Sequence, residues 1–425
     1  MPSRRPPPYL YSAVPLLFLV AFILPKLHAF LPVSPYSTYT STSFSSTALQ
    51  AKKPSTKKSS GTGASTVKGF GSAKPSASSS SSSTVQHPLL KDKGHLALID
   101  WIQTQGGLIN HLAVASIQPY NIRGIVALKP FKKGDIIISI PYSLALDVTP
   151  PSLPSSSSTL ADPIPAALEL LRQLDDEEIK ARYAPYLAMI PSATTKQGEG
   201  GYGLTTDFFT KSELESLQWP PTLVETNNRI QRTQEAAKEG GREEGLVRWA
   251  VWMVVSRSLG IAPALLGEGE GGRGGGRSGQ RQVLIPFLDL CNHDEGSPHV
   301  LTGREGGMLK VVAGREVGVG EEVAFAYGGG QLTSDRFVQD YGFLEEKGGE
   351  GGGNGGRDWD RRMVRGMIKA GRREEVERFV AGFREEEEEE KEEKEGWKED
   401  VGERAKMARR FARRMRAACV AELAK

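Results

Sequence analysis

The chain contains only two cysteines among its 425 residues, Cys291 and Cys419. One possible pair cannot form a disulfide framework, and such scarcity is typical of a reducing compartment. It also excludes a cysteine-rich zinc cluster, because a structural zinc site needs four ligands. The formal net charge of +3 is small and combines a basic presequence, a near-neutral middle and a tail with a glutamate run at residues 385–390. The sequence therefore predicts no nucleic-acid partner.

Acidic residues are absent from the first 91 positions, and Asp92 is the first of them. Arg4 and Arg5 precede an apolar run at residues 16–24, which is too short to span a bilayer comfortably. Residues 30–91 are rich in Ser, Thr, Ala and Lys, a composition typical of a transit peptide and unable to build a core. We predict a signal peptide at residues 1–29 and a transit peptide or disordered linker at residues 30–91.

The residues around the expected cleavage site indicate the compartment to which the protein is imported. Ala29 offers a small residue for cleavage, and Phe30 follows directly. A phenylalanine at this place resembles the bipartite presequence of proteins imported into the plastids of algae with secondary plastids. We therefore expect a plastid protein without stable membrane association after processing; a secreted protein is the alternative.

The remaining chain divides by composition. We predict one domain at residues 92–345 with a helical insertion at about residues 150–280, followed by a charged helical tail at residues 346–425. Apolar spacing predicts helices at residues 95–105, 164–186 and 246–259. In the tail, an apolar residue recurs every four positions, which predicts a helix that docks on the protein's own helices: Met407, Phe411, Met415 and Cys419.

Two motifs carry most of the chemical information. Residues 284–293 (LIPFLDLCNH) read as a buried strand that ends in Asn292-His293, which places polar groups at the edge of a core. Residues 320–328 (GEEVAFAYG) read as a second strand that delivers Tyr327 to a glycine turn.

Three further segments accompany these motifs in a fixed order. Residues 123–141 (RGIVALKPFKKGDIIISIP) read as a glycine turn, a short strand, a Lys-Gly-Asp turn and an apolar strand stopped by proline. Residues 248–257 (RWAVWMVVSR) form a helical pattern that ends in Ser256-Arg257. Residues 334–343 (SDRFVQDYGF) end in Tyr341-Gly342-Phe343.

Together these motifs resemble the SET domain of the Rubisco large-subunit methyltransferase-like family. The resemblance covers roughly residues 95–345 and implies an α+β fold, a SET-domain β core with a helical insertion and a short helical C-terminal region. Two departures stand out. The family usually has asparagine where this chain has Asp335, and extra glycines at residues 328–330 lengthen the segment from Tyr327 to Tyr341.

The resemblance implies an S-adenosyl-L-methionine-dependent protein-lysine N-methyltransferase, acting on a plastid protein such as Rubisco or aldolase. Tyr327 would be catalytic and would orient the acceptor amine. Five residues would bind the cofactor: Arg257, Asp289, Asn292, His293 and Tyr341. Methyl transfer needs no metal, and none is expected, although Asp289, His293 and His299 could be imagined as ligands. Two alternatives remain, a catalytically inactive SET-fold interaction protein and a protein-histidine methyltransferase.

Overall fold

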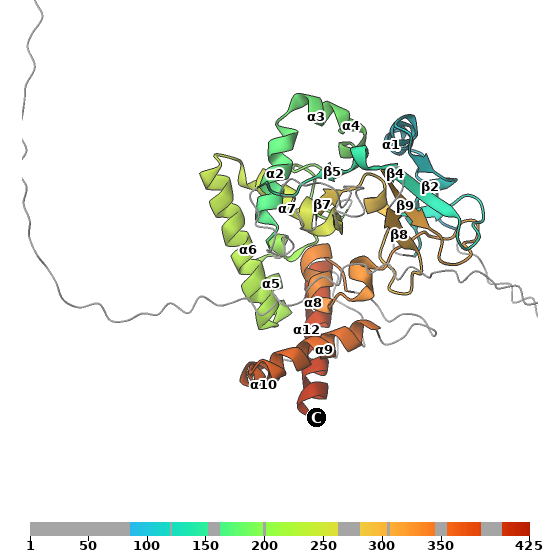
Figure 1. Ribbon diagram of the computed structural model, residues 1–425. Helices are drawn as coiled ribbons and strands as arrows, with labels where there is room; N and C mark the ends of the chain where they lie inside the picture. Colours follow the sequence, from blue (N-terminus) through green and yellow to red (C-terminus); the bar gives the residue numbers. More distant parts are fainter. Residues whose placement is uncertain are drawn as a thin grey trace, which may run out of the picture.

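The computed structural model describes residues 86–119, 121–151, 162–198, 201–261, 281–303, 307–344, 355–383 and 402–425. The expected signal peptide, most of the expected transit peptide and the glutamate run of the tail lie outside these ranges. Strands gather on one side of the molecule and most helices on the other (Figure 1). The chain is therefore an α+β protein, and this prediction from the sequence is confirmed.

Short strands form three antiparallel sheets within the described residues. The strands are β1 (Leu108–Ile109), β2 (Leu112–Ile117), β3 (Ile122–Ala127), β4 (Ile136–Pro141), β5 (Leu146–Asp147), β6 (Ser258–Ile261), β7 (Arg281–Leu284), β8 (Val300–Gly303) and β9 (Met308–Val312). Their orders are β1-β4-β9-β8, β2-β3 and β5-β7-β6. In the largest sheet Ile140 faces Leu309. Because these strands are distant in sequence, the sheet requires the fold of the whole domain.

Helices surround the sheets and form the C-terminal region. They are α1 (Lys93–Thr104), α2 (Ile164–Leu174), α3 (Glu177–Arg182), α4 (Ala184–Leu187), α5 (Lys211–Leu217), α6 (Pro220–Glu239), α7 (Glu244–Arg257), α8 (Ser334–Arg336), α9 (Gly355–Lys369), α10 (Arg373–Gly382) and α12 (Glu403–Leu423). Helical turns are η2 (Tyr142–Leu144), η5 (Thr206–Phe208), η7 (Leu288–Leu290), η8 (Tyr327–Gly330) and the π-helical turn η9 (Phe337–Tyr341). None of these described helices has the length and apolar character needed to cross a membrane.

Helices α1 and α7 confirm two of the expected helices, but the single helix expected at residues 164–186 is wrong. Asp176 accepts hydrogen bonds from the amides of Glu178 and Ile179 and begins α3. A proline stands in the first turn of α4. An aspartate N-cap satisfies the free amides of a helix start, and proline is tolerated only in a first turn. The segment therefore folds as three helices.

The long strand expected at residues 284–290 is also wrong. Strand β7 ends at Leu284, Phe287 has a positive φ of 71°, and residues 288–290 form η7. Pro286 cannot donate to a sheet ladder, so the apolar run turns inward instead of continuing. Residues 320–326 likewise form only single bridges to Val126 and His293. Gly124 lies inside β3 and not in a turn.

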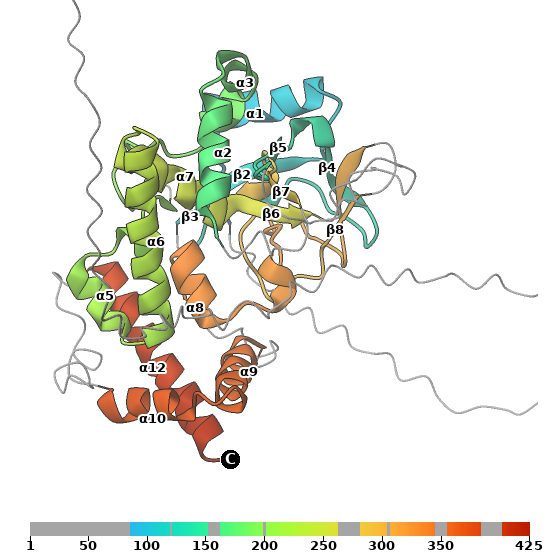
Figure 2. The same ribbon diagram turned by 60° about the vertical axis from the view of Figure 1, so that its left-hand side comes forward.

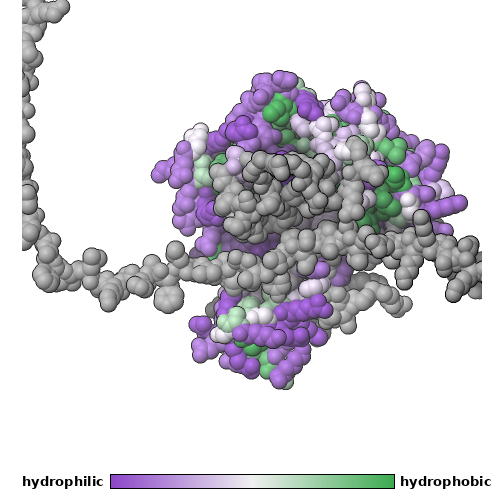
Figure 3. Space-filling view, viewed as in Figure 1, coloured by the Kyte–Doolittle hydropathy of each residue, from purple (hydrophilic) through white to green (hydrophobic). Residues whose placement is uncertain are grey.

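The described residues pack around two main apolar cores. One lies between the sheets and helices α1 to α4, α6 and α7, and the other lies between α5 and the C-terminal helices. The apolar stripe of α12 belongs to the second core, with Phe411, Met415 and Cys419 buried. Helix α12 packs against α5, α9 and α10, and Figure 2 shows α5 beside it. The surface of this region is mostly hydrophilic in Figure 3. The expectation that the stripe docks on the protein's own helices is confirmed.

One carboxylate ties the C-terminal helices to the rest of the protein. Asp360 of α9 accepts hydrogen bonds of 2.7 Å from both the amide and the hydroxyl of Ser334, the first residue of α8. Arg414 of α12 donates to the same carboxylate at 3.0 Å. The start of α8 is thus held from two C-terminal helices.

Gly342, which ends η9, permits a direct test of backbone packing. Its φ is +73°, and an added Cβ would lie 2.4 Å from the backbone of Leu204. We expect Gly342→Ala to lower the free energy of unfolding by about 3 kcal/mol or more, because the strain of a left-handed residue adds to a backbone clash. Gly371→Ala is the matched control, since Gly371 has φ +81° but no neighbour within 4 Å, and should cost only about 1 kcal/mol. Equal losses in urea unfolding of the two variants would contradict the packing argument.

Asp335 predicts a pH dependence of stability. Burial, opposed in part by Arg336, raises the pKa of this carboxyl from 3.8 to about 6. The folded protein therefore binds the proton more tightly than the unfolded chain, so stability should fall as pH rises from about 4 to about 6. Asp335→Asn removes this loss, which is at most about 3 kcal/mol because one pKa unit corresponds to about 1.4 kcal/mol. Urea unfolding of both proteins at pH 4 and pH 7 measures this loss of stability. If the variant and the wild type differ by the same free energy of unfolding at both pH values, the prediction is refuted.

Candidate functional site

The site contains a cluster of aromatic rings from three segments. His293 follows η7, Tyr327 begins η8, and η9 with the residues after it supplies the other rings. The ring centroids of Tyr327 and Tyr341 lie 4.9 Å apart, and those of His293 and Tyr327 lie 5.1 Å apart. Phe337 and Phe343 complete the cluster, at 4.6 Å and 6.1 Å from His293. The sequence motifs around Asn292-His293 and Tyr341-Gly342-Phe343 are thus adjacent in space, as expected.

Tyr327 is fixed by two hydrogen bonds. Its hydroxyl donates to the carbonyl oxygen of Cys291 at 2.7 Å, and its amide donates to Nδ1 of His293 at 3.0 Å. Burial, followed by the neighbouring Tyr341, raises the pKa of the Tyr327 hydroxyl far above its ordinary value. The phenol is therefore neutral at physiological pH and cannot act as a base. Because its proton is already donated, its oxygen can accept a hydrogen bond from a substrate.

Tyr341 lies at the end of the π-helical turn, directly before Gly342. Burial, followed by the charge of Asp340, raises the pKa of its hydroxyl above the ordinary value. The left-handed conformation of Gly342 then turns the chain so that Phe343 also contacts the cluster. The π-helical turn thus supplies Tyr341, and the residue after its glycine supplies Phe343.

Asn292 joins three segments. Its Nδ2 donates to the carbonyl oxygen of Arg123 at 2.9 Å and to the carboxylate of Glu322 at 2.8 Å. A Cβ on Gly124 would lie 2.7 Å from both this nitrogen and Glu322. Strand β3 therefore needs glycine there, because only glycine lets the asparagine approach. Burial raises the pKa of Glu322.

A charged cluster lies beside the aromatic rings. Asp289, whose side chain is fully buried, forms a 3.1 Å ion pair with Arg257 and accepts a 2.8 Å hydrogen bond from the hydroxyl of Tyr186. Burial, followed by the charge of Arg257, lowers the pKa of Arg123 to about 10. The charges of Asp289 and Asp92 both act on Arg123, so two carboxylates lie near the two guanidinium groups. Among the described residues, Nε of Arg257 and Oδ1 of Asp289 have no hydrogen-bond partner.

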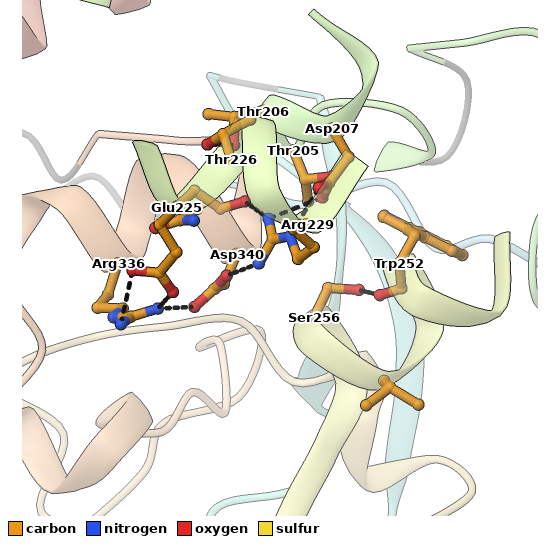
Figure 4. Close-up of polar contacts among 12 residues, drawn as sticks. Thr205, Thr206, Asp207, Glu225, Thr226, Arg229, Trp252, Ser256, Arg336 and Asp340 are labelled. Atoms are coloured by element: carbon orange, nitrogen blue, oxygen red, sulfur yellow. Dashed lines mark hydrogen bonds and ion pairs between the residues drawn. The ribbon is translucent and has the colours of Figure 1, made fainter. Parts of the chain in front are cut away.

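Arg257 is oriented by its own helix. It is the last residue of α7, and its guanidinium lies 5.1 Å from the ring centre of Trp252. The preceding Ser256 donates back to the carbonyl oxygen of Trp252 at 2.6 Å (Figure 4). Such a bond satisfies the hydroxyl within the helix, so the serine supports the helix end and the arginine faces the charged cluster.

The structure places every expected site residue in one of these neighbouring groups. Tyr327, Tyr341 and His293 share the aromatic cluster, Arg257 and Asp289 form the ion pair, and Asn292, next to His293, bonds strand β3 and Glu322. The charges of Arg257 and Asp289 also act on the pKa of Tyr327, which makes the two groups neighbours. Among the described residues, no three His, Cys, Asp or Glu side chains are arranged as metal ligands.

Three further residues of the site were missed by the sequence analysis: Arg123, Tyr186 and Glu322. Arg123 precedes the glycine of a motif that the sequence does show. However, no local pattern indicates that its charge would face Asp289, which is more than 160 positions away. Tyr186 lies in the helical insertion, where its apolar ring reads as an ordinary core residue. Only the folded chain brings these residues together.

Comparison with known proteins identifies the fold. No protein-family model matches the sequence, and no curated protein is detectably similar to it. Among solved structures, the SET domain of LSMT bound to lysine and AdoHcy is similar, with a TM-score of 0.51 and 16% identity over 76% of this chain and 88% of that one. Rubisco LSMT bound to AdoMet gives a TM-score of 0.50 and 16% identity over 78% and 93% of the two chains. The LSMT SET domain with MeLysine and AdoHcy gives 0.52 and 15% over the same shares. The chain therefore has the SET-domain fold of these structures, as its motifs predict.

Proposed function

We propose that the protein is an S-adenosylmethionine-dependent protein-lysine N-methyltransferase. The observation that carries the proposal is the state of Tyr327. It is a neutral phenol whose proton is donated to Cys291, in an aromatic cluster beside the buried ion pair of Arg257 and Asp289. Solved structures of the same fold support this assignment: one holds AdoHcy with lysine, one holds AdoMet, and one holds sinefungin with monomethyllysine.

The charged cluster fits the amino-acid part of the cofactor. Arg257 and Asp289 form a buried ion pair, and Nε of Arg257 has no partner among the described residues. The carboxylate of S-adenosylmethionine would accept this free N–H. Asp289 would receive its ammonium group at the unpartnered Oδ1. His293, Asn292 and Tyr341 would contribute the wall of the same pocket.

The cofactor, when bound, supplies a methyl group that its sulfonium already activates, so the protein's own residues must bind, orient and desolvate. The oxygen of Tyr327 accepts an N–H of the acceptor amine and thereby directs the nitrogen lone pair. The rings of Phe337, Tyr341 and Phe343 exclude water. A site of this kind lowers the pKa of a lysine amine, because burial disfavours the charged form. The lysine can then react as a neutral nucleophile.

Two measurements test the proposal. Isothermal titration calorimetry should show that the purified protein binds S-adenosylmethionine. Transfer of a labelled methyl group to Rubisco or aldolase, followed by identification of the modified residue, should then give methyllysine. Methylhistidine would instead identify a histidine methyltransferase. The absence of cofactor binding would refute the enzyme and favour an interaction protein with the same fold.

Tyr327→Phe separates catalysis from binding. The change removes one hydroxyl and keeps the ring, so cofactor binding should persist while kcat falls by about tenfold or more. That loss corresponds to about 1.4 kcal/mol or more of transition-state stabilisation. Tyr183→Phe is the matched control, since the hydroxyl of Tyr183 also donates to a backbone carbonyl, that of Ala145 at 3.4 Å, outside the cluster. Full activity of Tyr327→Phe would remove this hydroxyl from the mechanism.

We also propose that the protein acts in a plastid. The proposal rests on the acid-free segment that follows the short apolar run, and on Phe30 after the expected cleavage site. Residues 1–91 fused to a fluorescent reporter should enter the plastid of an alga with a secondary plastid, whereas Phe30→Ala should leave the reporter outside the envelope. Unchanged import of the altered fusion would contradict the bipartite targeting signal.

A further inference from the structure

The π-helical turn η9 is an unusual support for a residue of the site. It covers Phe337–Tyr341, and Tyr341 is its last residue. π-Helical turns are rare because their hydrogen-bond geometry is less favourable than that of an α-helix, and they occur often at functional sites. A turn of this kind persists only where surrounding contacts determine it. The contacts of η9 therefore show which residues stabilise the π-helical turn.

Arg229 of α6 supplies the polar contacts that link η9 to η5. Its guanidinium donates to both carboxylate oxygens of Asp207, at 2.6 and 2.7 Å. It also donates to the carboxylate of Asp340 at 2.6 Å and to the carbonyl oxygen of Gln339 at 3.0 Å. The side chain of Arg229 is only 6% exposed. One buried arginine thus holds the two residues before Tyr341 by side chain and by backbone (Figure 4).

Asp340 is held from a second direction. Arg336 lies 3.5 Å from its carboxylate and donates to Glu225 of α6 at 2.7 and 3.1 Å. Figure 4 shows the resulting chain of ion pairs from α6 to η9. Buried charges that lose a partner are costly, so each ion pair restricts the position of the next one.

The same segment that anchors Arg229 also confines the residue after Tyr341. Leu204 lies against Gly342 so closely that a Cβ there would approach its backbone to 2.4 Å. Asp207, three residues later, binds Arg229. Residues 204–207 therefore fix the backbone on both sides of Tyr341.

We propose that Arg229 and Asp340 are positioning residues, which hold the π-helical turn so that Tyr341 stays against Tyr327. Neither residue belongs to the aromatic cluster, and both act through the backbone of η9. The proposal rests on the proposed function for its effect on turnover. The fixed conformation of η9 itself does not depend on that function.

Asp340→Asn is the sharpest test. The variant keeps the shape of the side chain, removes its charge, and leaves Arg229 paired with Asp207, so the protein should fold. Asp162→Asn is the matched control, because Asp162 pairs with Arg232 on the same helix at the surface, with 30% of its side chain exposed. Arg229→Lys removes the bidentate contacts from the other side and should reproduce the effect of Asp340→Asn.

Two readouts are needed. In hydrogen exchange followed by mass spectrometry, a peptide covering residues 337–343 should exchange faster in Asp340→Asn than in the wild type. With S-adenosylmethionine and whichever of Rubisco or aldolase the wild type methylates, kcat should fall about ten- to a hundredfold, as expected when a residue that orients the reacting groups is misplaced. The KM for the acceptor should stay the same. The Asp162→Asn control should change neither exchange nor kcat.

The outcomes are distinct. Unchanged exchange in residues 337–343 would overturn the proposal, and so would faster exchange with undiminished kcat in an active protein. An equal loss in the Asp162→Asn control would also overturn it, because the effect would then be general to α6. A wild-type protein that binds no S-adenosylmethionine would refute the proposed function, while the exchange measurement would still decide whether the two residues hold η9.

Discussion

The side-chain amide of Asn292 is the interaction on which the geometry of the site depends. It bonds the backbone of Arg123 and the carboxylate of Glu322 at the same time, so it joins segments that are more than 100 residues apart. The adjoining Cys291 carbonyl receives the hydroxyl of Tyr327, and the adjoining His293 receives its amide. Three consecutive residues thus determine where strand β3, the extended segment at residues 320–326 and the tyrosine meet. The close approach at Gly124 follows from this arrangement and is not an independent feature.

Buried charge distinguishes the binding region from its supports. Asp360 forms an ion pair with Arg414 and accepts a hydrogen bond from the start of α8. Arg229 forms ion pairs with two aspartates. Both of these clusters are satisfied by the protein itself. The Asp289 cluster differs, because Nε of Arg257 and Oδ1 of Asp289 have no partner among the described residues. Buried polar atoms of this kind cost stability unless a ligand or solvent completes them. The site and the two supporting clusters therefore use the same residue types but differ in how completely the protein itself satisfies them.

The sequence predicted the parts of this site that are encoded locally. The order of the motifs indicated the fold, and short signals such as Asn-His, Tyr-Gly and Tyr-Gly-Phe identified the residues that meet in the aromatic cluster. It failed where a local turn or cap signal was overlooked, and where a distant partner decides the role of a residue. Residues 284–290 have the composition of a strand, but Pro286 and the positive φ of Phe287 turn them into the core. Residues 164–186 have helical spacing, but one aspartate cap and one proline divide them. The roles of Arg123 and Arg229 depend on residues more than 100 positions away, which no local pattern can reveal.

The C-terminal helices take part in this arrangement through one end of a short segment. Residues 334–341 begin at Ser334, held by Asp360 of α9, and end at Tyr341, held through Asp340 by α6. The segment is thus anchored at one end by the C-terminal core and at the other by the helical insertion. Asp335 is buried between these anchors beside Arg336, Asp360 and Glu225, and its burial raises its pKa. A charged carboxylate at this position lowers the stability of the folded protein, whereas an uncharged residue would not. The anchoring at both ends is what lets the segment tolerate it, because neither end can move away to solvate the charge.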